Sequence, residues 1–123
     1  MKTRSALIAL TAFALLPLVA LAADIGGTWT TSFDSQVGVQ SYTFTFVVNG
    51  TQLTGKAKSA NGDNAIEEGK IDGSKVSFVE NMDYQGMALR IVYTGTVVSA
   101  DEIKFKRDVG GQGGEDFTAK RSK

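Results

Sequence analysis

Strict two-residue alternation between apolar and polar side chains is the feature that most restricts the fold of this chain. In the clearest segment, residues 41–48, Tyr42, Phe44, Phe46 and Val48 share one face, and serine and threonine residues occupy the other. Successive side chains of a β-strand point to opposite faces, so this period of two predicts a strand with one buried face. The segments after residue 23 alternate in this way and end in turn signals, which predicts β-structure throughout.

Turn signals divide the alternating sequence into about eight short strands. Asn49-Gly50 predicts a hairpin with a type I′ turn, which needs positive φ at both central residues. Gly69 leaves the parity of segment 65–71 open, as a β-bulge would. We expect strands over residues 26–33, 41–48, 52–58, 65–71, 76–80, 87–96, 103–107 and 115–120. Their even spacing predicts an all-β fold, an antiparallel up-and-down meander closed into a barrel, with a β-sandwich as the alternative.

The first 22 residues differ from the rest of the chain. Lys2 and Arg4 precede an uncharged apolar run over residues 6–21, and small residues follow at a cleavage position. This layout predicts a signal peptide over residues 1–22 and a single β-barrel domain over residues 23–123. An uncleaved membrane anchor is the alternative, because the run is just long enough to span a bilayer. With cleavage, we expect a periplasmic or extracellular protein without a membrane span.

Composition excludes several functional classes. The chain contains no cysteine and no histidine, so it has neither disulfides nor the commonest metal ligand and acid–base residue. Removing Lys2 and Arg4 from 13 basic residues leaves 11 against 13 acidic ones, a net charge of about −2. We therefore expect no nucleic-acid partner, no metal and no cofactor. A disulfide-free exported domain favours a bacterial source.

Three charged residues continue the parity of apolar faces. Glu80 follows Val76 and Phe78, Arg107 follows Ile103 and Phe105, and Glu115 precedes Phe117 and Ala119. If these faces point inward, the charges point into the barrel, where burial is costly unless they are paired. Such a cluster would grip a polar ligand group or form a structural ion pair. The alternative is a solvated rim, because each residue lies near a strand end.

The inward aromatic face suggests a ligand site. The candidate ligand-binding residues are Tyr42, Phe44, Phe46, Phe78, Glu80, Tyr93, Phe105, Arg107 and Glu115. No catalytic pair stands out, because adjacent carboxylates on a strand point to opposite faces. The Gly110–Gly114 loop lacks the Gly-Lys-Ser/Thr ending of a phosphate-binding loop and reads as a connection beside the barrel mouth.

Two short motifs, Gly27-Thr28-Trp29 and Lys120-Arg121, lie near the two ends of the expected mature chain and indicate a family resemblance. With the meander of hairpins, these residues resemble the calycin group of lipocalins, fatty-acid-binding proteins and avidins, and in particular small secreted bacterial barrels. The resemblance implies that Trp29 is structural and lies across the closed end, covered by Arg121 or Arg107. The lipocalin helix is missing, and a single tryptophan cannot build the cage of a biotin site.

Three functions follow from these observations. The leading one is a secreted or periplasmic binding protein that holds a small, largely apolar or amphipathic ligand in the barrel. The second is a barrel filled by its own side chains that acts as a protein-interaction or inhibitor-like module through its outer surface. The third is a cyclase or isomerase that uses Glu80 or Glu115 as a base near Arg107.

Overall fold

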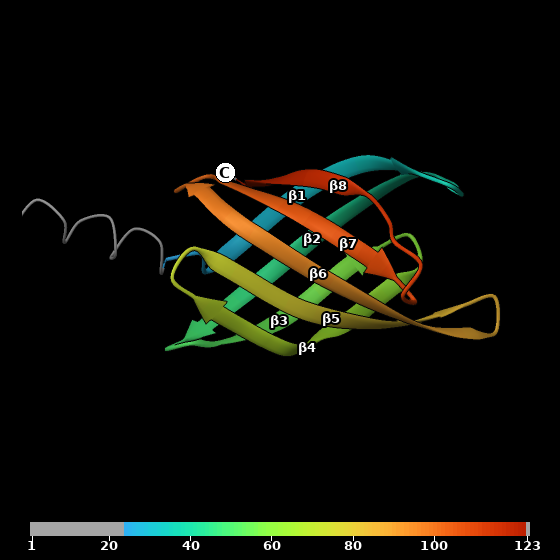
Figure 1. The fold of residues 1–123 in the computed structure, drawn as a ribbon, viewed down its shortest axis with the longest axis horizontal. Coiled ribbons are helices and arrows are strands. Elements are labelled where there is room, and N and C mark those ends of the chain that lie inside the picture. Colours follow the sequence, from blue (N-terminus) through green and yellow to red (C-terminus); the bar gives the residue numbers. More distant parts are fainter. Residues whose placement is uncertain (1–23, 123) are drawn as a thin grey trace, which may run out of the picture.

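A computed structural model describes residues 24–122 as eight strands without a helix (Figure 1). The signal-peptide prediction for residues 1–22 lies outside the described residues. Within residues 24–122, no helix is long and apolar enough to cross a membrane. The strands are β1 (Gly27–Ser35), β2 (Gly38–Asn49), β3 (Gln52–Ser59), β4 (Gly62–Asp72), β5 (Lys75–Tyr84), β6 (Met87–Ser99), β7 (Glu102–Val109) and β8 (Asp116–Arg121).

The strands form one closed antiparallel barrel in sequence order. Each strand pairs with the next, and β8 returns to pair with β1 through Trp29↔Arg121 and Thr30↔Lys120. The predicted fold class, an eight-stranded up-and-down barrel, is confirmed, and the sandwich alternative is wrong. Closure leaves no long unpaired edge that could template aggregation.

Alternating connections give the barrel two different ends. The β1–β2, β3–β4 and β5–β6 hairpins and the β7–β8 loop gather at one end, which we call the mouth (right in Figure 1). The N-terminal segment 24–26, the other three turns and the C-terminus gather at the opposite end, which we call the closed end. The long β5–β6 hairpin projects beyond the barrel at the mouth.

Aromatic rings fill the centre of the barrel. Phe44 lies within 5.4–6.3 Å, centroid to centroid, of six other rings: Tyr42, Phe46, Phe78, Tyr93, Phe105 and Phe117. Phe78 stacks on Tyr93 at 4.6 Å, and Phe33 stacks on Phe117 at 4.7 Å. Stacked and edge-to-face pairs at these distances are favourable beyond the area they bury. The inward parity read from the sequence therefore produces a packed core around Phe44.

The structure corrects the predicted turn after β2. Asn49 pairs with Gln52, so the central turn residues are Gly50 and Thr51. Gly50 has φ of 65°, whereas neither Asn49 nor Thr51 has positive φ. The predicted type I′ turn on Asn49-Gly50 is therefore wrong, although the hairpin is present. Pairing of Asn49 extends β2 by one residue, and glycine then occupies the first central position, as in type II′ turns.

The bulge expected near Gly69 is present in β4. The pairing of β4 with β5 shifts register between Glu67 and Lys70, and Glu68 has φ of 52°. Ile66 and Ile71 are both buried although an odd number of positions separates them. The extra residue restores Ile71 to the inner face, which a strict alternation would deny it.

Candidate functional site: the mouth pocket

A pocket of about 560 Å³ opens at the mouth of the barrel. Its floor is formed by inward side chains near strand ends, including Tyr42, Met82, Ile91 and Arg107, and its wall includes the Gln112–Glu115 part of the β7–β8 loop. An outer groove over β6–β8 has a similar volume, about 520 Å³, but it is lined by exposed lysines and by threonines. The mouth pocket therefore stands out by its inward, mixed lining rather than by its size.

Arg107 lies at the base of this pocket and is almost fully buried. Its guanidinium carbon lies 5.0 Å from the ring centroid of Phe33, 5.5 Å from that of Tyr42 and 5.7 Å from that of Tyr93. Rings at these distances attract the cation through their quadrupoles. Their π-faces offer no conventional acceptor atoms, so this box holds the guanidinium without satisfying its N–H donors.

Glu115, the residue immediately before β8, faces Arg107. The backbone N–H of Arg107 donates to the carbonyl of Glu115 at 2.9 Å, which fixes the two residues opposite each other. Their side chains form a loose ion pair, with Arg107 Nη1 3.7 Å from Glu115 Oε1. This separation is beyond hydrogen-bond reach, so attraction between the charges is present but the directional bond is not made.

Three buried polar atoms beside the pocket have no hydrogen-bond partner among the described residues. They are the Tyr42 hydroxyl, Arg107 Nε and Glu115 Oε1. All three residues line the mouth pocket. A buried donor or acceptor without a partner costs about 1–3 kcal/mol, so the pocket that these three residues line is the candidate site for binding a polar group.

Glu80 is fully buried deeper in the barrel and does not line the pocket. Its Oε1 accepts a hydrogen bond from the Tyr93 hydroxyl and its Oε2 accepts one from the Asn64 amide, both at 2.8 Å. Burial, and then the nearby Glu80 carboxylate, raise the pKa of Tyr93 far above its usual range. The same two causes, in the same order, raise the pKa of Tyr42, and the nearby Tyr93, Arg107 and Ser59 side chains partly oppose this rise.

The structure divides the predicted ligand-binding residues into two groups. Tyr42, Arg107 and Glu115 line the mouth pocket, whereas six lie in the packed interior outside it: Phe44, Phe46, Phe78, Glu80, Tyr93 and Phe105. The parity argument placed Glu80 and Arg107 inside correctly, but they are not partners of each other. Whether any of these residues binds a ligand stays a prediction.

Sequence reasoning missed Asn64 and most of the pocket lining. Asn64 shares the inward parity of Ile66, but it was not recognised because Gly69 left the parity of this segment open. Met82 continues the face of Phe78 and Glu80 by one further step, a signal that the shorter expected strand cut off at residue 80. Three amide side chains of the lining, Gln36, Asn61 and Gln112, gave no periodic signal, because they lie in connections between strands.

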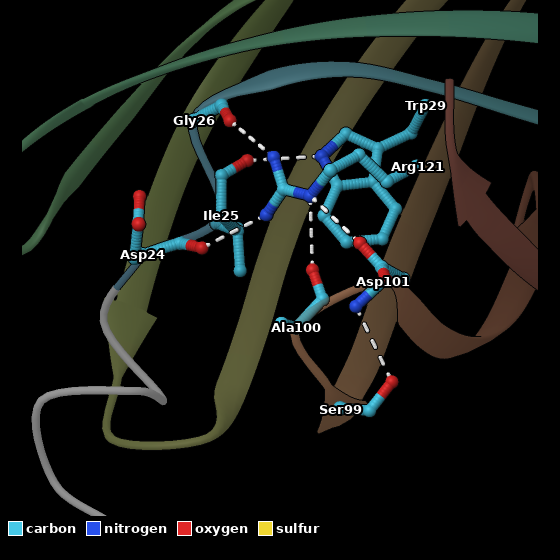
Figure 2. A network of polar contacts seen from close by, with 8 residues as sticks. All are labelled: Asp24, Ile25, Gly26, Trp29, Ser99, Ala100, Asp101 and Arg121. Carbon is cyan, nitrogen blue, oxygen red and sulfur yellow. Dashed lines mark hydrogen bonds and ion pairs between the residues drawn. The ribbon is translucent and has the colours of Figure 1, made fainter. Parts of the chain in front are cut away.

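The closed end is sealed by Trp29 and Arg121 (Figure 2). Trp29 is fully buried, and its Nε1 donates to the Ile25 carbonyl at 3.0 Å. The Arg121 guanidinium carbon lies 4.5 Å from the Trp29 ring centroid. Of the two arginines considered for this position, Arg121 is therefore the one that covers the tryptophan, and Arg107 lies at the mouth.

The β7–β8 loop is tied to the barrel rather than wrapped around an anion site. The Val109 N–H donates to the Gly113 carbonyl at 3.0 Å, and the Gly113 N–H donates to Asp108 Oδ1 at 2.6 Å. Within residues 24–122, no three Asp or Glu side chains gather as a metal ion would require. The mouth is lined by hydrogen-bonding, charged and apolar side chains.

These features define a class: an eight-stranded up-and-down barrel, packed at its centre, sealed at one end and open at the other. No protein-family profile and no curated protein matches the chain. Among solved structures it is similar to Pallilysin (Tp0751) of Treponema pallidum, with a TM-score of 0.49 and 14% identity, covering 89% of this chain and 82% of that chain. Likeness at this level carries no information on function, and the calycin resemblance stays a prediction.

Proposed function

We propose that this chain is an exported, calycin-like binding protein that holds a small amphipathic ligand in its mouth pocket. The observation that carries the proposal is that Tyr42, Arg107 and Glu115, each with a buried polar atom that lacks a hydrogen-bond partner, line one pocket of about 560 Å³. Ligand pockets of small molecules have volumes of this order and combine an apolar lining with a few polar groups.

Packing confines the ligand to the mouth. Phe44, Phe78 and Phe105 are buried against one another and leave the barrel axis to side chains. A ligand threaded along the axis would have to displace these rings, which densely packed interiors resist. The bound molecule therefore rests on the floor formed by Tyr42, Ile91 and Arg107, with its outer part at the rim.

Native mass spectrometry of the protein purified from its host tests this proposal. We expect a complex heavier than the chain, whose extra mass is released by organic solvent. Leu89→Trp, which would fill a half-buried position of the pocket wall, should abolish the extra mass. Val47→Trp, at an exposed position of β2, is the matched control and should retain it. Absence of any releasable molecule, together with no thermal shift across a ligand library, would count against the proposal.

The exported location is a separate part of the proposal. It rests on the basic start, the apolar run and the small residues within positions 1–22. Cell fractionation with N-terminal sequencing should find a mature chain that begins after Ala22 or Ala23 in the periplasmic or external fraction. A full-length chain retained in the cytoplasm would show that this part is wrong.

Exposed apolar residues favour the interaction module as the second candidate. Val37 and Val39 on the β1–β2 hairpin and Met87 on the β5–β6 hairpin are 62%, 68% and 64% exposed, and all lie at the mouth end. Apolar side chains at hairpin tips favour contact with a protein partner. A partner captured from periplasmic extract that is lost with Val39→Ser and Met87→Ser, but retained with Leu89→Trp, would favour this candidate over the first.

A further inference from the structure

The unpartnered atoms at the mouth include both a hydrogen-bond donor and a hydrogen-bond acceptor, which restricts the class of ligand. Arg107 Nε can only donate, Glu115 Oε1 accepts, and the Tyr42 hydroxyl can do either. A group that satisfies the first two must present an acceptor and a donor close together. This inference rests on the proposed binding function and concerns the chemistry of the ligand's polar end.

The charge of the pocket argues against an ionic ligand. Among residues 24–122, Arg107 and Glu115 are the only charged residues that line it, and their opposite charges lie 3.7 Å apart. A carboxylate placed on Arg107 would sit beside the Glu115 carboxylate, and an ammonium placed on Glu115 would sit beside the guanidinium. Like charges brought together in a partly desolvated site are strongly unfavourable.

Two kinds of uncharged side chain supply most of the remaining lining. Aliphatic and thioether side chains form one part, from Val37, Met82, Leu89, Ile91 and Val109. Primary amides form the other part, from Gln36, Gln40, Asn61 and Gln112. Amides bind amides through paired donors and acceptors, and the aliphatic part suits a short hydrocarbon chain.

We propose that the mouth pocket binds an uncharged amphipathic amide, a molecule with a carboxamide or N-acylamine group and a short apolar chain. The amide oxygen accepts from Arg107, and the amide N–H donates to Glu115. The apolar chain covers Met82, Leu89 and Ile91. The loose ion pair is thereby bridged by a neutral group that complements both of its ends.

Calorimetric titration with three matched eight-carbon probes tests the proposal on the unaltered mature protein. Octanamide should bind about tenfold or more tightly than octanoate and octylammonium at neutral pH, because only the amide complements both side chains without adding charge. Tighter binding of octanoate or octylammonium would overturn the amide assignment while leaving the binding function intact. Failure of all three probes to bind would overturn the amide assignment; if native mass spectrometry also releases no molecule, the binding function falls with it.

A variant that neutralises Glu115 tests whether this residue sets the preference for octanamide over octanoate. Glu115→Gln removes the negative charge beside Arg107, so octanoate affinity should rise about tenfold relative to octanamide affinity. Glu67→Gln removes the same charge from an exposed outer position of β4 and should change neither. An unchanged ratio of the two affinities in Glu115→Gln would show that Glu115 does not set the preference. A melting curve of each variant establishes that both are folded.

Discussion

Arg121→Lys tests whether the closed end is stabilised by the shape of a guanidinium or only by its charge. Arg121 donates from Nη1 to the Gly26 carbonyl at 2.7 Å, from Nη2 to the Asp24 carbonyl at 3.0 Å, and from Nε to the Ala100 carbonyl at 2.9 Å (Figure 2). These acceptors lie in the N-terminal segment and in the β6–β7 turn. A lysine ammonium keeps the charge but is a compact donor that cannot reach three such separated carbonyls.

The expected cost follows from the bonds that are lost. A hydrogen bond in a folded protein contributes a net ~0.5–1.5 kcal/mol, and more when the donor is charged. The Arg121 side chain is a quarter exposed, so ~1 kcal/mol for each bond is appropriate. Lysine retains one bond and the contact with the Trp29 ring, so Arg121→Lys should lower the free energy of unfolding by about 2 kcal/mol. Arg121→Met, which loses all three bonds and the cation–π contact, should lower it by about 3–4 kcal/mol.

Urea denaturation followed by tryptophan fluorescence measures both losses, because Trp29 is the only tryptophan and lies under Arg121. The dependence on urea should keep its slope, which would show that the variants share the native and unfolded states of the parent. Asp101→Asn is the control for simple charge effects, since its ion pair with Arg121 is exposed and contributes less than about 1 kcal/mol. Arg121→Lys within about 0.5 kcal/mol of the parent would refute the argument from guanidinium geometry.

Three further predictions concern the core and the mouth. Trp29→Ala should cost about 3–5 kcal/mol by urea denaturation followed by circular dichroism, because it leaves a cavity at the closed end; native Trp29 emission should resist iodide quenching. The pKa of Tyr93 is raised, so the folded state keeps a proton that the unfolded state loses above pH ~10. The free energy of unfolding should therefore fall by about 1.4 kcal/mol per pH unit above that pH. Tyr93→Phe should remove this contribution to the pH dependence. Arg107→Met combined with Glu115→Gln should leave stability equal or raise it by about 1 kcal/mol in urea, while abolishing octanamide binding in calorimetry.

The fold could be predicted almost entirely from the sequence because barrel strands obey one simple rule. Alternation placed Tyr42, Phe44 and Phe46 on the inner face of one strand, and the same parity placed Glu80 and Arg107 inside although both are charged. Parity is set by the backbone, so it holds for a charged residue as well as for an apolar one. The closed topology followed from even spacing and short connections.

Details that depend on contacts between strands could not be predicted. The turn after Asn49 moved by one residue because pairing with Gln52 decided its position, and local sequence carries no information on that pairing. Whether Arg107 or Arg121 covers Trp29 depends on which end of the barrel each strand end reaches. Asn64 became visible as the partner of Glu80 only when the bulge at Glu68 had fixed the parity of β4.

The arginines at the two ends of the barrel differ in how completely their guanidinium groups are hydrogen-bonded, and this difference supports the proposed function. Each of the three Arg121 guanidinium nitrogens donates to a backbone carbonyl. Arg107 is more deeply buried, yet its Nε is unpartnered and its acid, Glu115, stands too far away to bond. A fold with about 5–15 kcal/mol of net stability loses a substantial fraction of it to such unpaired groups. Apolar residues at both positions would avoid that loss. The polar pair at the mouth is therefore the feature that the proposed binding function would explain.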